Sequence, residues 1–177
     1  MDSPTIAASF LESARYRFRS IKDLGDKALA QVSDADLLWS PDGESNSIAV
    51  IVQHLHGNMM SRWTDFLTTD GEKNRDRDGE FVAQASTTRT DILARWEQGW
   101  QCLFRTLESL RPEDLAKEVA IRGQKLGVID AIHRQIAHYG YHVGQIVYIA
   151  KHLRGEGWQT LSIARNRSGE YRPARRD

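Results

Sequence analysis

Residues 127–154, GVIDAIHRQIAHYGYHVGQIVYIAKHLR, decide the fold class of this chain. The stretch contains no proline, and it is too long for a strand. Its apolar residues recur at three- and four-residue steps, the period of one helix face: Ile129, Ile132, Ile136, Val143, Ile146, Val147 and Ala150. The sequence therefore predicts a long amphipathic helix that begins near Gly127 and ends at about Arg154, with its apolar face packed against other helices.

Three earlier segments show the same periodicity, at about residues 5–32, 46–68 and 86–110. Polar or charged stretches separate them, and the short segment 115–127 alternates enough to be extended instead. Four long helices without a convincing sheet predict an all-α four-helix bundle with long interhelix connections. We expect one domain over residues 1–177, with roughly the last ten residues frayed.

Composition excludes several classes of function. The chain has 177 residues, with 24 Lys plus Arg against 24 Asp plus Glu, so it lacks the excess positive charge typical of a nucleic-acid-binding protein. No stretch is apolar for long enough to span a membrane, and residues 1–10 do not resemble a signal peptide. The single cysteine, Cys102, cannot form an internal disulfide and is expected to be a packing residue. A cytoplasmic location is the resulting prediction.

Two of the six histidines, His138 and His142, are four residues apart in the last predicted helix. At about 100° per residue their side chains differ by only about 40° around the helix axis, so both point the same way. Such a pair can hold a divalent metal through two neutral imidazole nitrogens. An ordinary hydrogen-bonded pair is the alternative, and a metal site needs a third donor from another helix.

The helix over residues 46–68 offers His54 and His56 as that donor. Their side chains leave the helix about 160° apart, so only one can face the pair, and periodicity only mildly favours His54. His133 and His152 lie roughly 8 to 15 Å along the axis from the pair, which is too far to share one ion. We expect these two to be surface or packing residues.

The motifs HLHGN (54–58) and HYGYHVGQIVYIAK (138–151) resemble those of the DinB-like superfamily of four-helix bundles. The resemblance extends over most of the chain. Residues 46–73 look like the branch known only as a domain of unknown function. In the superfamily, one histidine of the second helix and an H-x3-H pair of the fourth bind a divalent metal, which here implies His54, His138 and His142.

Characterised members of the superfamily are thiol-dependent S-transferases and isomerases, and they form dimers. The resemblance therefore implies a divalent ion, zinc or nickel, together with a low-molecular-weight thiol and a small electrophile as partners of a homodimer. A thiol bound to the ion would be deprotonated at neutral pH. The alternatives are a metal-binding bundle without catalysis, in which Gln145 or a carboxylate of residues 70–78 closes the site, and a purely structural dimerising bundle.

The charged connection 70–78, DGEKNRDRD, has two interpretations. It could be a lid or an anion clamp, but a solvated connection with weak surface ion pairs is favoured, and Arg75 and Arg77 are the residues most open to a functional role. Three tryptophans, Trp63, Trp96 and Trp100, are expected in the core rather than in a substrate pocket. Tyr141, close to His138 around the axis, could supply a proton.

Overall fold

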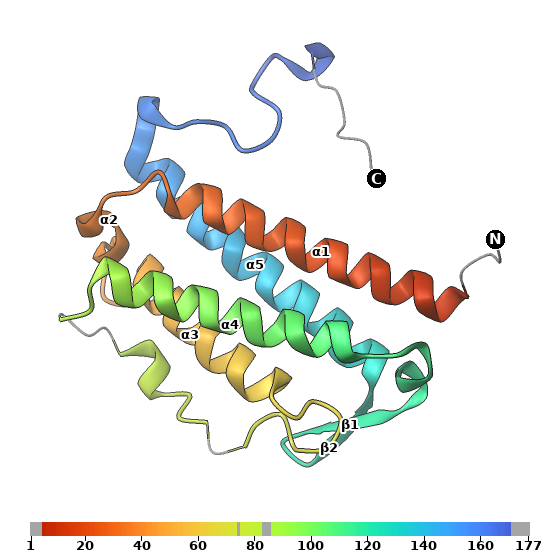
Figure 1. The fold of residues 1–177 in the computed structure, drawn as a ribbon. Helices are drawn as coiled ribbons and strands as arrows, with labels where there is room; N and C mark the ends of the chain where they lie inside the picture. Colours follow the sequence, from red (N-terminus) through yellow and green to blue (C-terminus); the bar gives the residue numbers. More distant parts are fainter. Residues whose placement is uncertain (1–4, 74, 83–85, 171–177) are drawn as a thin grey trace.

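The computed structural model describes residues 5–73, 75–82 and 86–170, and these are mostly helical (Figure 1). The α-helices are α1 (Ile6–Leu29), α2 (Asp34–Leu38), α3 (Ile48–Trp63), α4 (Arg89–Ser109) and α5 (Val128–Arg154). Single 3-10 turns lie at η1 (Gly79–Phe81), η2 (Pro112–Ala116), η3 (Gly155–Gly157) and η4 (Ser168–Glu170). The predicted extended segment contains an antiparallel hairpin, β1 (Glu118–Ile121) and β2 (Gln124–Gly127). A mostly helical chain is therefore confirmed, with a small sheet added.

The long helices contact one another mainly as two pairs, α1 with α5 and α3 with α4 (Figure 1). Aromatic side chains join the pairs through one core. Phe18 of α1 lies edge-on to Trp63 of α3, with ring centroids 5.7 Å apart, and Trp100 of α4 lies edge-on to Tyr139 of α5 at 5.8 Å. All four are essentially inaccessible to solvent, and Trp96 is buried as well. The predicted core role of the three tryptophans is confirmed.

Hydroxyl side chains set the starts of four helices. Thr5, Ser33, Ser47 and Thr88 precede α1, α2, α3 and α4, and each accepts a hydrogen bond from the backbone N–H three residues later. Such caps satisfy amides that have no partner inside the helix. This explains why the predicted starts of α1, α3 and α4 lie within about three residues of the observed ones, whereas the short helix α2 was not predicted.

Helix α3 ends at Trp63, five residues before its predicted end at Thr68. The backbone carbonyl of Trp63 accepts a hydrogen bond from the Thr106 hydroxyl at 2.7 Å, and Lys73 Nζ donates to the carbonyls of Ser61 and Thr64. Side chains from elsewhere thus satisfy the last-turn carbonyls, so the helix stops without a glycine or proline signal. One predicted core position is also wrong, because Ile129 is 39% exposed.

A buried chain of hydrogen bonds connects α3 with α5. Trp63 Nε1 donates to the Tyr139 hydroxyl, which donates to Asn58 Oδ1, and both distances are 2.9 Å. Burial raises the pKa of Tyr139, so the phenol keeps its proton. Because these buried polar groups satisfy one another, they help to fix how far along its axis α3 lies against α5. His54 is one turn before Asn58, and His138 precedes Tyr139.

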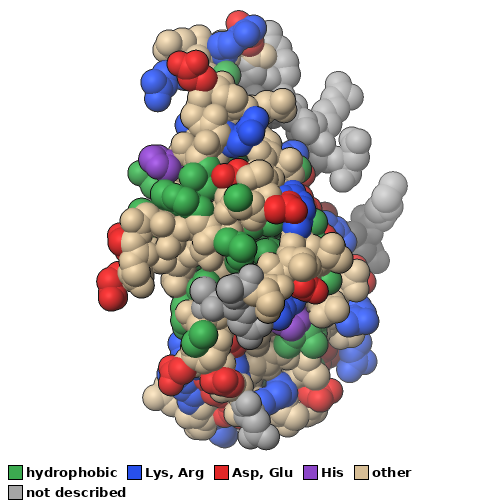
Figure 2. Space-filling view, turned by 90° about the vertical axis from the view of Figure 1, so that its left-hand side faces the viewer, with side chains coloured by type: hydrophobic (Ala, Val, Ile, Leu, Met, Phe, Trp, Pro, Cys, Tyr) green, Lys and Arg blue, Asp and Glu red, His purple; other side chains and the backbone are tan. Residues whose placement is uncertain are grey.

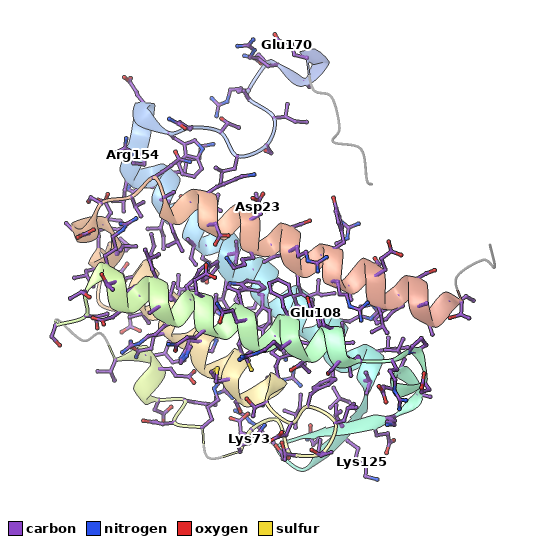
Figure 3. All side chains as sticks on the ribbon, viewed as in Figure 1. Asp23, Lys73, Glu108, Lys125, Arg154 and Glu170 are labelled. Carbon is purple, nitrogen blue, oxygen red and sulfur yellow. The ribbon has the colours of Figure 1, made fainter. Side chains whose placement is uncertain are left out.

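The connection after α3 is attached to the hairpin. Asp70 accepts hydrogen bonds from the backbone amides of Arg122 and Gly123 in the hairpin turn, at 2.9 and 2.7 Å, and Gly71 N donates to Ala120 O at 2.8 Å. Figure 3 places Lys73 and Lys125 at the same end of the molecule. This part of the predicted loop is therefore held in place by backbone hydrogen bonds.

The segment after α5 returns to α1. Gln159 N donates to Gln31 Oε1 at 2.8 Å, Gln31 Nε2 donates back to Gln159 O at 3.1 Å, and Trp158 packs against the core. The predicted frayed end falls largely on residues 171–177, outside the described residues. In the described part of the chain, no helix is long and apolar enough to cross a membrane. Figure 2 shows acidic and basic side chains interspersed over the face in view.

Candidate metal centre

Helices α3 and α5 bring His54, His138 and His142 together. Each offers a ring nitrogen, and these three atoms lie within 4.8 Å of one another. His54 and His142 are buried and His138 is half-buried. No carboxylate of the described residues joins this cluster, so the suggested fourth ligand from residues 70–78 is not found there. The three histidines could hold a metal ion.

The other three histidines lie elsewhere. His56 is half-buried on a different face of α3, near Gln98 and Arg95 of α4. The rings of His133 and His152 pack against Phe10 and Trp39, with centroids 5.2 and 5.6 Å apart. The 160° separation of His54 from His56 thus places only His54 beside the pair, as the spacing requires.

The nitrogen atoms of His54 and His138 are placed as two ligands of one ion would be. His54 Nδ1 lies 3.0 Å from Glu80 Oε2, and a carboxylate only accepts, so Nδ1 carries the proton and Nε2 the lone pair. That Nε2 lies 3.2 Å from Nε2 of His138. Two nitrogens bound tetrahedrally at about 2.0–2.1 Å from one zinc ion would be about 3.3 Å apart. The observed separation fits a shared cation, and it equally fits an N–H···N hydrogen bond between the two imidazoles.

His142 supplies an unpartnered nitrogen. Its Nδ1 donates to Gln145 Oε1 at 2.8 Å, which leaves the lone pair on Nε2. That Nε2 is buried and has no hydrogen-bond partner among the described residues. A buried acceptor without a partner is costly, and a metal ion would satisfy it. Gln145 therefore orients His142 through its amide oxygen, which is the atom that Gln145 would have used as a fourth metal ligand.

Glu80 and Arg75 support His54 from the segment between α3 and α4. Arg75 Nε and Nη2 donate to the two carboxylate oxygens of Glu80 at 2.6 and 2.5 Å, and both side chains are at least 92% buried. Burial alone would raise the pKa of Glu80, but hydrogen bonds from His54 and Arg75 outweigh it and lower the pKa. A carboxylate on the far nitrogen of a ligand histidine fixes its tautomer and raises its basicity.

The prediction that the connection 70–78 is solvated is wrong for Arg75, because its side chain is almost fully buried. Sequence reasoning missed Glu80 altogether. The sequence does contain a signal for Glu80, the glycine of the motif HLHGN. Gly57 lies one turn after His54, and the Glu80 carboxylate packs against α3 at this glycine. A Cβ at position 57 would overlap Glu80 Oε1. A glycine inside an apolar helix costs about 1 kcal/mol, which points to a close approach of another group.

Replacing Gly57 by alanine is expected to lower metal affinity roughly 10–100-fold, because it displaces Glu80 from His54. The matched control is Gly144→Ala on α5, where nothing lies within 4 Å of the added methyl group. Competition titrations with a chromogenic chelator measure both affinities. Equal affinities in the two variants would contradict the role given to Glu80.

Burial keeps the two α5 histidines neutral. It is the main cause that lowers the pKa of His138 to about 3 and of His142 to about 4, and the neighbouring imidazoles add to it. A neutral imidazole is the form that binds a metal. Both side chains are thus ready to act as ligands at neutral pH.

The same shifts predict how the metal-free protein responds to acid. In the unfolded chain these histidines have a pKa of about 6.5, so below that pH the unfolded state takes up protons that the folded state does not. The free energy of unfolding should therefore fall as the pH falls from about 6.5 towards 4. Urea unfolding with a chelator at pH 7, 6 and 5 measures this, and the His138→Gln/His142→Gln variant should show a weaker pH dependence. If the double variant showed the same pH dependence of unfolding as the wild type, the lowered pKa values would not belong to His138 and His142. His133→Gln is the control.

A cavity of about 600 Å³ adjoins the three histidines, and a second of about 670 Å³ lies next to it. Asn46, Tyr141 and Gln145 line both, so the two are neighbours. The second is partly aromatic, with Trp39 and Tyr148 in its wall. The Tyr141 ring centroid is 4.1 Å from that of His142, which places the predicted proton donor beside the site.

Fold and site together define a mostly helical protein with a buried three-histidine cluster able to hold a metal ion. The chain belongs to the DUF1572 family, described as proteins of unknown function, whose family model matches residues 5–167. That range contains the three histidines, Arg75 and Glu80. No curated protein and no solved structure matches the chain.

Proposed function

We propose that the protein is a DinB-like four-helix bundle that binds one divalent metal ion through His54, His138 and His142. The observation that carries this proposal is the buried, unpartnered Nε2 of His142 beside the two Nε2 atoms that face each other. Three neutral nitrogens suit zinc or nickel among the common divalent ions. When bound, such an ion would lower the pKa of a thiol or water in its open position.

We further propose that the site transfers a small thiol to a small electrophile. The protein's own residues would hold and shield the reactants. Glu80 and Gln145 fix the imidazoles, and Phe81 covers His54, with ring centroids 4.7 Å apart. The aromatic cavity behind Tyr141 suits an apolar part of the electrophile. Two adjoining cavities would let both reactants approach the histidines together.

Thiol binding is the test of this function. Protein purified without an affinity tag is first analysed for metal, since a structural bundle would contain none. The cobalt-substituted form is then titrated with a panel of cellular thiols, and we expect a thiolate charge-transfer band to appear. Alcohols of matched structure are the control. A spectrum indifferent to every thiol at millimolar concentration would exclude the transferase and leave a metal-binding bundle.

A further inference from the structure

All charged residues in the wall of the cavity beside the histidines are arginines: Arg62, Arg75, Arg77 and Arg134. Two of them already have carboxylate partners. Arg75 is paired with Glu80, and Arg62 Nη2 donates to Glu72 at 2.7 Å. Because no acidic side chain in the described ranges lines the cavity, the other two arginines leave it with excess positive charge.

The remaining two arginines are available to a ligand. Arg134 is exposed and forms no hydrogen bond or ion pair with any described residue. Among the described residues, Arg77 comes no closer to a carboxylate than 3.9 Å, from its Nε to Glu72 Oε1, and Glu72 already accepts from Arg62. Neither side chain is needed to neutralise a buried carboxylate, so each can bind an anion at the mouth of the cavity.

Besides atoms of His138 and His142, two buried polar atoms in residues of the wall have no partner among the described residues: Arg62 Nε and Gln135 Oε1. Their residues are only 6% and 4% exposed. A metal ion bound by the histidines cannot satisfy Arg62 Nε, because a guanidinium has hydrogens to donate and no lone pair to offer. Arg62 Nε lacks an acceptor and Gln135 Oε1 lacks a donor, and both atoms are enclosed by protein.

We infer that this cavity binds the oxyanion group, carboxylate or phosphate, of a small molecule. Arg134 and Arg77 hold the oxyanion at the mouth of the cavity. Arginine matches such groups with paired, charge-assisted hydrogen bonds. A volume of about 600 Å³ suits a metabolite-sized ligand. The inference rests on the proposed function in one respect only, namely that the ligand's reacting group lies at the histidines.

The experiment titrates the full chain, with its metal content measured, against three probes at constant ionic strength: acetate, inorganic phosphate and acetamide. Acetamide matches acetate in shape but carries no charge. We expect acetate or phosphate to bind with one-to-one stoichiometry by calorimetry, and the one that binds identifies the oxyanion. The Arg77→Gln/Arg134→Gln variant should bind it at least about tenfold more weakly. Arg105→Gln, an exposed arginine on α4, is the matched control.

Comparison with the metal-free His138→Ala/His142→Ala variant separates this inference from the proposed function. An arginine-dependent affinity for the oxyanion in both proteins supports the inference, even if the wild type proves to hold no metal. Binding that requires the metal and ignores the arginines overturns the inference and leaves the metal site standing. Failure of both anions to bind, or equal binding of acetamide, also overturns it. Because Arg134 is exposed and unpaired, loss of folding does not complicate the result.

Discussion

Alanine at His54 is expected to abolish stoichiometric binding of a divalent metal, while alanine at His56 leaves it intact. His54 provides the only cluster nitrogen that does not come from α5, and two nitrogens of one helix do not enclose an ion. The loss should exceed the roughly 10–100-fold effect of removing an outer partner such as Glu80. Elemental analysis after loading and desalting measures the metal content of both variants.

Far-ultraviolet circular dichroism is the control for this result. Of the four core rings Phe18, Trp63, Trp100 and Tyr139, only Tyr139 has a ring contact with a cluster histidine, His138, with ring centroids 5.4 Å apart. The contacts of the four rings with one another remain, so even the His54→Ala/His138→Ala/His142→Ala variant should keep its helical spectrum. If that triple variant still retained one equivalent of metal, the site would lie elsewhere. Equal loss of metal in His54→Ala and His56→Ala would mean that the register of α3 described above is wrong.

The second large effect is on stability. Glu80→Ala should lower the free energy of unfolding of the metal-free protein by about 3–5 kcal/mol, because it leaves the Arg75 guanidinium buried without its counter-ion. The matched control is Glu108→Ala. Glu108, labelled in Figure 3, forms an exposed pair with Arg19 at 3.7 Å, and such pairs contribute at most about 1 kcal/mol. Urea unfolding in the presence of a chelator compares the two.

A double replacement checks the cause. The Arg75→Met/Glu80→Leu variant has neither charge. It should therefore be more stable than Glu80→Ala and recover part of the free energy of unfolding that Glu80→Ala loses. If Glu80→Ala proves no more destabilising than Glu108→Ala, the buried pair does not have the energetic role given to it here. Failure of the second replacement to recover stability would instead point to packing around Glu80 as the cause.

Periodicity and spacing predicted much of this structure because both are properties of a single helix. The apolar steps placed the four long helices, with most ends within about three residues. The four-residue spacing of His138 and His142 put both on one face of α5, and the angular argument allowed only one of His54 and His56 to join them. Periodicity only mildly favoured His54 over His56. The resemblance to DinB-like proteins was the stronger reason for choosing His54.

The remaining features depend on contacts between distant segments, which no periodicity records. Helix α3 stops at Trp63 because Thr106 and Lys73 satisfy its last carbonyls. Glu80 and Arg75 lie in a charged stretch that reads as solvated, yet tertiary packing buries both. Mutual neutralisation makes that burial possible, and neither charge alone would predict it.

The hydrogen-bond chain from Trp63 through Tyr139 to Asn58 contains no metal ligand, yet it sets the position of α3 against α5. The same bonds hold the histidines of α3 and α5 facing one another without relying on a metal ligand. Metal uptake should then be a simple exchange reaction of a folded protein, unlike that of a zinc finger, which folds only on binding. An ion bound by the three histidines would accordingly be selected by the relative supply of competing cations.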